Sequence, residues 1–195
     1  MPCSKTFWHF SKPQSIDGIY RLRGKLDPRF SMSSPKRILR LRVNGHLKEV
    51  LARDASTLLD VLRDSFGLSG TKRGCDLGTC GCCAVQVDGE PLLSCLTLAA
   101  EVEGKEIRTI EGLSGTERFA PLQECWANAG ASQCGFCSPG FLMTADALLR
   151  ENAQPTREEI QEALAGNLCR CTGYVKIIQA VQDCAKISAK EGIRE

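Results

Sequence analysis

The sequence predicts an α+β protein with two small domains, a sheet-and-helix domain followed by an all-helical one. Two observations carry this prediction. Over residues 36–113, short apolar runs alternate with turn signals, which favours strands and hairpins. From residue 114 onward, apolar residues recur at helical spacing and each segment has a helix-start signal. A chain of 195 residues can form two small cores, and domains of that size often need stabilisation beyond their packing.

The first domain is predicted to form four or five strands around one helix. Its first two strands flank Asn44-Gly45, a dipeptide typical of tight hairpin turns. Ser56 or Thr57 can cap the helix that follows, and Gly67 ends it. The remaining strands are expected near residues 84–87, 91–98 and 106–110, with Asp88-Gly89 as the turn between the first two of them.

The second domain is predicted to be a bundle of four helices joined by short connections. Ser138 is the expected N-cap of the second helix, with Pro139 at its first position. Thr156 and Glu159 fit a capping box for the third helix, and Thr172 is the expected cap of the last one. The four helices should cover about residues 117–129, 138–149, 156–166 and 172–185.

Twelve cysteines are a heavy load for this length. In a secreted chain they would indicate disulfides, but residues 1–30 lack the apolar run of a signal peptide. No later run reaches the roughly 20 apolar residues of a membrane span. We therefore expect a cytoplasmic protein without a membrane span, in which clustered cysteines are metal ligands. Residues 1–35 are basic without a dense Lys/Arg cluster, so we expect a flexible extension and no nucleic-acid partner.

The first cysteine group is Cys75-x4-Cys80-x2-Cys83 followed by Cys95. This is the spacing of plant-type ferredoxins, in which four thiolates hold one [2Fe–2S] cluster. Cys82 leaves an alternative open, because Cys80-x-Cys82 could replace Cys80-x2-Cys83. Zinc is a second alternative, although zinc sites favour two C-x2–4-C pairs.

The loop that carries this group, residues 71–83, is too rich in glycine and cysteine for a regular element, so we expect it to wrap a ligand. Glycines allow backbone amides to approach the sulfurs, and hydrogen bonds from those amides help to set the reduction potential of a cluster. The glycines expected to do so are Gly74, Gly78 and Gly81.

The second cysteine group joins Cys134-x2-Cys137 to Cys169-x-Cys171 across 31 intervening residues. From the residues alone, two such pairs could hold zinc, or a C-x2-C redox pair could be present, but the Cys-x-Cys half argues against both. Each pair precedes a predicted helix, and helix N-termini stabilise anionic thiolates with free amides and partial positive charge. The spacing therefore predicts a metal site without naming the metal.

Three stretches resemble one protein family, the iron–sulfur subunit or domain of the molybdenum hydroxylases. This family includes xanthine dehydrogenase, aldehyde oxidoreductase, carbon monoxide dehydrogenase and 4-hydroxybenzoyl-CoA reductase. The stretches are GCDLGTCGCC at 74–83, QCGFCSPG at 133–140 and GNLCRCTGY at 166–174. The resemblance extends over about residues 36–186 and includes all eight ligand positions. This chain departs from the family pattern at Cys82, a position where the family commonly has a small residue.

The resemblance implies a β-grasp [2Fe–2S] ferredoxin domain over residues 36–113 and a four-helix-bundle [2Fe–2S] domain over residues 114–190. It implies an electron-transfer subunit that passes single electrons from a molybdopterin centre through the helical-domain cluster and then the ferredoxin-type cluster to FAD or another acceptor. Gln133 and Cys171 would contact the molybdopterin of a partner chain. Arg170 is expected to raise the potential of the second cluster through its charge. The implied ligands are Cys75, Cys80, Cys83 and Cys95 for the first cluster, and Cys134, Cys137, Cys169 and Cys171 for the second.

The resemblance also implies partner chains, because 195 residues are too few for an added flavin or molybdopterin domain. The expected partners are a large molybdopterin-binding subunit and a medium FAD-binding subunit, in a heterotrimer that can pair into a dimer of heterotrimers. The substrate would be chosen by a partner, with no substrate-converting site on this chain. The alternative is a free-standing two-cluster ferredoxin that shuttles electrons between soluble partners.

Overall fold

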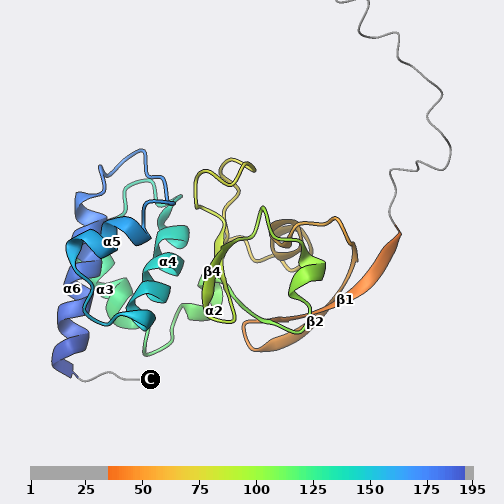
Figure 1. Cartoon of the computed structure of the whole chain (residues 1–195), viewed down its shortest axis with the longest axis horizontal. Helices are drawn as coiled ribbons and strands as arrows, with labels where there is room; N and C mark the ends of the chain where they lie inside the picture. Colours follow the sequence, from red (N-terminus) through yellow and green to blue (C-terminus); the bar gives the residue numbers. More distant parts are fainter. Residues whose placement is uncertain (1–34, 192–195) are drawn as a thin grey trace, which may run out of the picture. The chain divides into compact units, whose positions relative to one another are not determined.

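The computed structural model describes residues 35–191 and their side chains as far as Ile187. Apart from Pro35, the extension predicted for residues 1–35 lies outside the described residues. The described chain belongs to one compact unit. Figure 1 shows a sheet region and a helical region side by side within it. None of the described helices has the length and apolar character needed to cross a membrane.

The first half forms a five-stranded mixed sheet with the order β2-β1-β5-β3-β4. β5 runs parallel to β1, while the β1–β2 and β3–β4 pairs are antiparallel, as in a β-grasp fold. Both predicted hairpin turns are confirmed, because Asn44-Gly45 and Asp88-Gly89 have positive φ at both central residues. The strands are β1 (Lys36–Val43), β2 (His46–Arg53), β3 (Ala84–Val87), β4 (Glu90–Leu93) and β5 (Glu106–Arg108).

The helix between β2 and β3 packs against this sheet. Of its two predicted caps, Thr57 is the N-cap, and it forms a capping box with Asp60. Only α1 (Leu58–Asp60) is α-helical, and η2 (Val61–Ser65) continues it as a π-helix. Gly67 follows in the left-handed region, at φ 71°, as predicted for the end of a helix.

The strand predicted near residues 91–98 is shorter than expected. β4 ends at Leu93, and the Leu96 N–H then donates to the Leu93 carbonyl at 3.0 Å to form a turn. The Ser94 hydroxyl donates to the Cys83 carbonyl at 2.7 Å and holds this turn against the cysteine loop. Cys95 therefore lies on a turn and not within a strand. Two short helices were not predicted, η3 (Ala99–Val102) and α2 (Ile110–Leu113).

Four longer helices follow, as predicted: α3 (Ala120–Asn128), α4 (Ser138–Glu151), α5 (Arg157–Ala163) and α6 (Val175–Glu191). The capping box of Thr156 and Glu159 is confirmed at the start of α5. Two predicted caps are wrong. Ser138 is the first residue of α4, and its hydroxyl lies 2.6 Å from the Ser132 hydroxyl. Thr172 precedes the start of α6, and its hydroxyl donates to the Cys169 sulfur at 3.1 Å.

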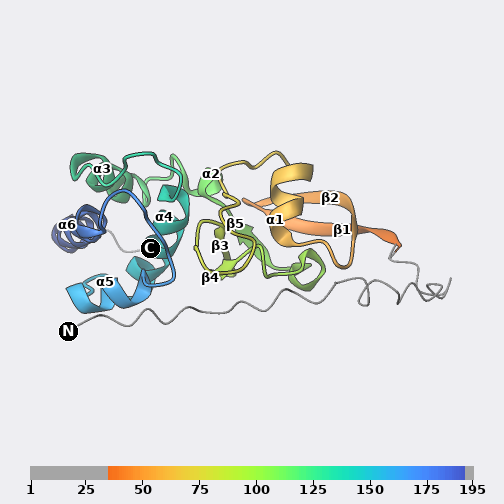
Figure 2. The same cartoon turned by 90° about the horizontal axis from the view of Figure 1, so that it is seen from above.

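α4 lies between the sheet and the other long helices, as Figures 1 and 2 both show. A buried polar network joins it to β3. The Gln86 amide nitrogen donates to the Met143 carbonyl at 3.0 Å and to the Asp146 carboxylate at 2.9 Å. Arg150 donates to the same carboxylate oxygen at 2.8 Å. Because this network and the apolar packing join the two halves into one unit, the division after residue 113 stays a prediction.

Candidate metal centres

The first cysteine group lies on the loop between η2 and β3 and on the turn after β4. Arg73 anchors this loop, because its guanidinium donates to Asp60 at 2.5 Å and to Asp76 at 2.7 Å. Asp60 belongs to the cap of α1, so the loop is tied to the helix before it. The segment from Thr71 to Cys83 contains no helix or strand, as the sequence predicts.

The four predicted ligands of this group interact in two pairs. Burial, followed by the interaction with Cys83, raises the pKa of Cys95 to about 11. Cys75 and Cys80 form the other pair.

Hydrogen-bond donors of the loop are directed at the Cys75 sulfur. The Thr79 hydroxyl, then the Leu77 and Thr79 amides, lower the pKa of Cys75 to about 6. The Leu77 amide nitrogen lies 3.4 Å from that sulfur. A sulfur with several such donors is suited to the anionic form, which is the form that binds metals.

The three loop glycines have separate roles. A Cβ at Gly74 would lie 2.7 Å from the Cys80 sulfur, so this position must stay open for the ligand group. Gly78 and Gly81 both have positive φ, at 71° and 69°. A Cβ at Gly81 would also lie 2.5 Å from the Gly166 carbonyl oxygen, so Gly81 allows close contact with the second cysteine group.

Cys82, the residue that leaves the ligand set open, is buried, with 5% of its surface exposed. Burial, followed by the interaction with Cys80, raises its pKa to about 12. Cys83 is the residue that interacts with Cys95. This geometry favours Cys83 as the ligand and Cys82 as a neutral thiol beside it, and the assignment stays a prediction.

The second cysteine group comes together from two segments that are distant in sequence. The Cys171 and Cys134 sulfurs lie 3.6 Å apart. Burial, followed by the interaction with Cys169, raises the pKa of Cys137 to about 12. Here too the four thiols form two pairs, Cys134 with Cys171 and Cys137 with Cys169.

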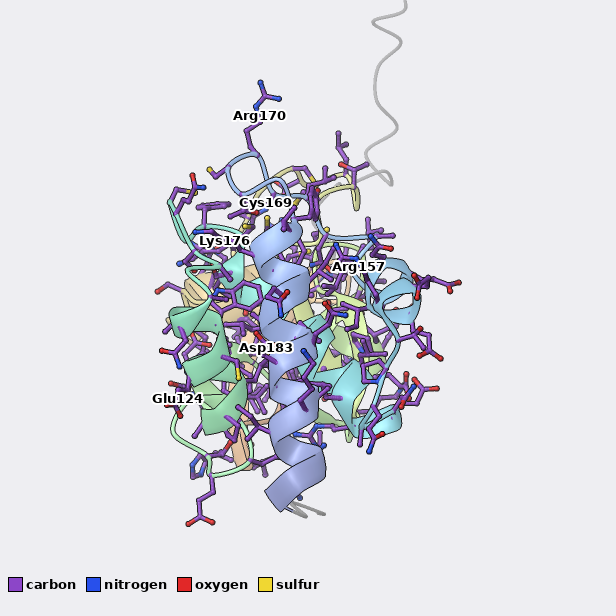
Figure 3. The ribbon with its side chains drawn as sticks, turned by 90° about the vertical axis from the view of Figure 1, so that its left-hand side faces the viewer. Glu124, Arg157, Cys169, Arg170, Lys176 and Asp183 are labelled. Atoms are coloured by element: carbon purple, nitrogen blue, oxygen red, sulfur yellow. The ribbon has the colours of Figure 1, made fainter. Side chains whose placement is uncertain are left out.

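Cys169 lies at the N-terminal end of α6, as Figure 3 shows. Burial alone would raise its pKa, but hydrogen bonds from the Thr172 hydroxyl and amide outweigh burial and lower it. The Cys169 amide donates to the Tyr174 hydroxyl at 3.1 Å, and the Tyr174 ring makes an edge contact with Phe141 of α4. These contacts connect the two segments of the second group.

The pairing of the thiols bears on the kind of metal centre. A zinc site needs its four ligands around one ion, whereas a [2Fe–2S] cluster shares four thiolates between two irons. In the second group, the approach of the Cys134 and Cys171 sulfurs to 3.6 Å, with Cys137 and Cys169 as a second interacting pair, fits ligands shared between two irons.

The two cysteine groups are in direct contact. The Leu168 amide donates to the Cys80 carbonyl at 2.9 Å, and the Asn167 side-chain amide donates to the Gly81 carbonyl at 3.1 Å. A Cβ at Gly140, in the first turn of α4, would lie 2.4 Å from the same Gly81 oxygen. Asn167 is buried, so its hydrogen bond is part of a closed contact between the groups.

The second group is the more exposed of the two. Cys134, Cys171 and Gln133 are all exposed, and the Gln133 side chain makes no hydrogen bond within the described part of the chain. Phe136 and Leu168 expose 46% and 52% of their surface beside these residues. The predicted contact residues therefore lie on an open surface that contains large apolar side chains.

Sequence reasoning gave no role to Gly140, Asn167 or Tyr174, and it expected Thr172 to cap a helix and not to hold Cys169. Gly140 and Asn167 form the contact between the groups, while Thr172 and Tyr174 hold Cys169. All four lie within the stretches that carry the family resemblance. That resemblance is the signal that could have found them.

Two family models match the chain, a "2Fe-2S iron-sulfur cluster binding domain" over residues 41–113 and a "[2Fe-2S] binding domain" over residues 109–182. They define a protein with two 2Fe–2S-binding domains. Relatives and solved structures narrow this class. The chain belongs to the iron–sulfur subunits of the xanthine dehydrogenase family of molybdenum hydroxylases. The predicted family and the predicted fold class are thereby confirmed.

Three matches illustrate the similarity. The nicotinate dehydrogenase small FeS subunit of Eubacterium barkeri is 45% identical over 74% of this chain and 92% of its own length. The xanthine dehydrogenase iron-sulfur-binding subunit of Escherichia coli O157:H7 is 46% identical over 74% of this chain and 91% of its own. The crystal structure of quinoline 2-oxidoreductase from Pseudomonas putida 86 matches with a TM-score of 0.76 and 44% identity, covering 82% of this chain and 99% of that one.

Proposed function

We propose that this chain is the electron-transfer subunit of a molybdenum-containing hydroxylase. Two groups of four thiols, each within one matched 2Fe–2S-binding domain, are the observation that carries the proposal. When bound, a [2Fe–2S] cluster accepts and releases one electron at a time, so that a two-electron oxidation is divided into single steps. The proposed ligands are Cys75, Cys80, Cys83 and Cys95 for the first cluster, and Cys134, Cys137, Cys169 and Cys171 for the second.

The amides of this chain support the proposal. Leu77 donates to the Cys75 sulfur and Thr172 to the Cys169 sulfur, both at 3.4 Å. Such bonds stabilise anionic sulfur and tune the potential of a bound cluster. Because the donors belong to the backbone, they hold their positions without a change in side-chain conformation when the charge of a cluster changes.

The exposed surface at the second group supports an order of electron flow. We place the large molybdopterin-binding subunit on the surface formed by Gln133, Cys134 and Cys171, with Gln133 and Cys171 in contact with the pterin. Electrons would then move to the first group, whose segment is joined to the second by the hydrogen bond from Leu168 to Cys80.

The surface at the first group supports a second partner. Leu77 and Leu96 expose 75% and 63% of their surface beside Cys75 and Cys95. Exposed apolar side chains around a redox centre are suited to contact with another protein. We place the medium FAD-binding subunit there, in a heterotrimer that can pair into a dimer of heterotrimers.

Purification of the native protein from its source tests this proposal. We expect it to elute on size exclusion with a molybdenum-containing chain and a flavin-containing chain, and to carry iron and a visible absorption that dithionite bleaches. A stable monomer free of both chains would instead support a free-standing two-cluster carrier. Zinc in place of iron would contradict both functions.

A further inference from the structure

A hydrogen bond closes the loop that carries the first half of the second cysteine group. The loop begins at Ser132, directly before Gln133 and Cys134. It ends at Ser138, directly after Cys137. The Ser132 and Ser138 hydroxyl oxygens lie 2.6 Å apart, so they join the two ends of the loop. The positions of both thiols and of Gln133 therefore depend on this closure.

Trp126 of α3 holds the closure from outside the loop. Its indole nitrogen donates to the Ser132 hydroxyl at 2.9 Å. An indole N–H only donates, so Ser132 accepts this bond and can give its own hydrogen to Ser138. Trp126 exposes only 5% of its surface, but it borders a hollow of about 290 Å³ together with Ser132. Because packing is incomplete on that side, the hydrogen bond is needed to fix the orientation of the ring.

The Trp126 ring also leads to the other half of the second group. Its centroid lies 6.3 Å from that of Phe141 in α4, and the Phe141 and Tyr174 centroids lie 5.9 Å apart. The Tyr174 hydroxyl accepts from the Cys169 amide at 3.1 Å. Aromatic pairs at these separations stabilise a core beyond the apolar area that they bury. Three rings thus connect the Ser132–Ser138 loop to the segment that carries Cys169.

We propose that Trp126 is a positioning residue for the second metal centre and sets the geometry of the Ser132–Ser138 loop through its N–H bond to Ser132. This inference rests on the proposed function, in which the loop supplies two ligands of a cluster and the pterin contact Gln133. The ring contacts hold the two halves of the group together, while the N–H bond holds the loop. The indole has a single N–H and Ser132 takes it, so the first cluster should not respond to its loss.

The test separates the hydrogen bond from the ring. Trp126→Phe keeps an aromatic ring against Phe141 but removes the N–H, and Ser132→Ala removes the acceptor. Ser132→Thr keeps a hydroxyl and is the rescue variant. Each variant is purified with its clusters and partner chains. The readouts are the midpoint potential and EPR line shape of each cluster, and urea unfolding measures stability in parallel.

We expect both Trp126→Phe and Ser132→Ala to shift the potential of the second cluster and to leave the first unchanged. The shift should be larger in Ser132→Ala, which also opens the loop, and it can reach a tenfold change in the one-electron equilibrium, or about 59 mV. The double variant should match Ser132→Ala, because the bond is already absent there. Ser132→Thr should keep the native potential. Loss of the second cluster alone would be the extreme form of the same effect.

Cys125→Ala is the matched control. Cys125 directly precedes Trp126 in α3 and is also 5% exposed. Its truncation removes packing from the same helix without removing the bond to Ser132. This variant should lower the free energy of unfolding and leave both potentials unchanged.

Unchanged potentials in Trp126→Phe and Ser132→Ala would overturn the inference, because Trp126 would then contribute to packing alone. A double variant whose shift equals the sum of the two single shifts would also overturn it, since the two residues would then act separately. Both outcomes leave the proposed function intact. Absence of [2Fe–2S] signals from the native protein would overturn the proposed function itself.

Discussion

The two cysteine groups reach similar chemistry by different routes. The first takes three of its four cysteines from one short loop, and Cys83 is buried. The second joins two segments separated by 31 residues, and Cys134 and Cys171 are exposed. The first group is therefore defined mainly by local loop geometry, whereas the second exists only when α4 and α6 are correctly packed. The exposed group is also the one suited to a partner surface.

The largest expected effect comes from removing a single ligand, in one variant from the second group and in another variant from the first. Cys137→Ala should lose the second cluster and retain the first, because each group has its own four thiols. Half of the bound iron and one of two EPR signals should disappear. Cys83→Ala is the reciprocal variant and should lose only the first cluster. Loss of all iron in either variant would show that the two groups are not independent.

A substitution at the contact between the groups should have an intermediate effect. A Cβ at Gly140 would lie 2.4 Å from the Gly81 carbonyl oxygen, so Gly140→Ala must displace one group from the other. Overpacking of this kind costs about 1–3 kcal/mol. Urea unfolding should show this loss, and electron transfer between the clusters should slow in rapid-reduction experiments.

Gly166→Ala is the control for that substitution. A Cβ at Gly166 meets no atom within 4 Å, although this residue also lies beside the contact. Its stability should equal that of the native protein or exceed it by up to about 1 kcal/mol, because a Gly-to-Ala change without steric conflict lowers the entropy of the unfolded chain. Equal losses from both variants would show that the contact between the groups is not closely packed.

The smallest expected effect is at Arg170. Its side chain is exposed and projects beyond Cys169 at the end of α6, as Figure 3 shows. Arg170→Ala should move the second cluster to a slightly more negative potential, because a positive charge favours the reduced form. The shift should shrink at high salt, since exposed charges are screened. An unchanged potential at low salt would contradict a role for this charge.

Much of the fold could be predicted from short-range signals. Asn44-Gly45, Asp88-Gly89 and the capping box of Thr156 and Glu159 formed as predicted, because each depends on backbone geometry within a few residues. The predictions that Ser138 and Thr172 cap helices were wrong for the opposite reason. The Ser138 hydroxyl bonds to Ser132. The Thr172 hydroxyl donates to Cys169 and accepts from the Tyr174 amide, which lies before α6, and such competition is decided by the surrounding structure.

The same division applies to the cysteines. The sequence alone determined the spacing of the first group, because a loop of fixed length can place three thiols without help from the rest of the chain. Only the tertiary structure brought Cys134 to 3.6 Å from Cys171 and joined Leu168 to Cys80. It also enclosed Cys82 between the two groups. Contacts between distant segments depend on the packing of whole helices, which no local pattern specifies.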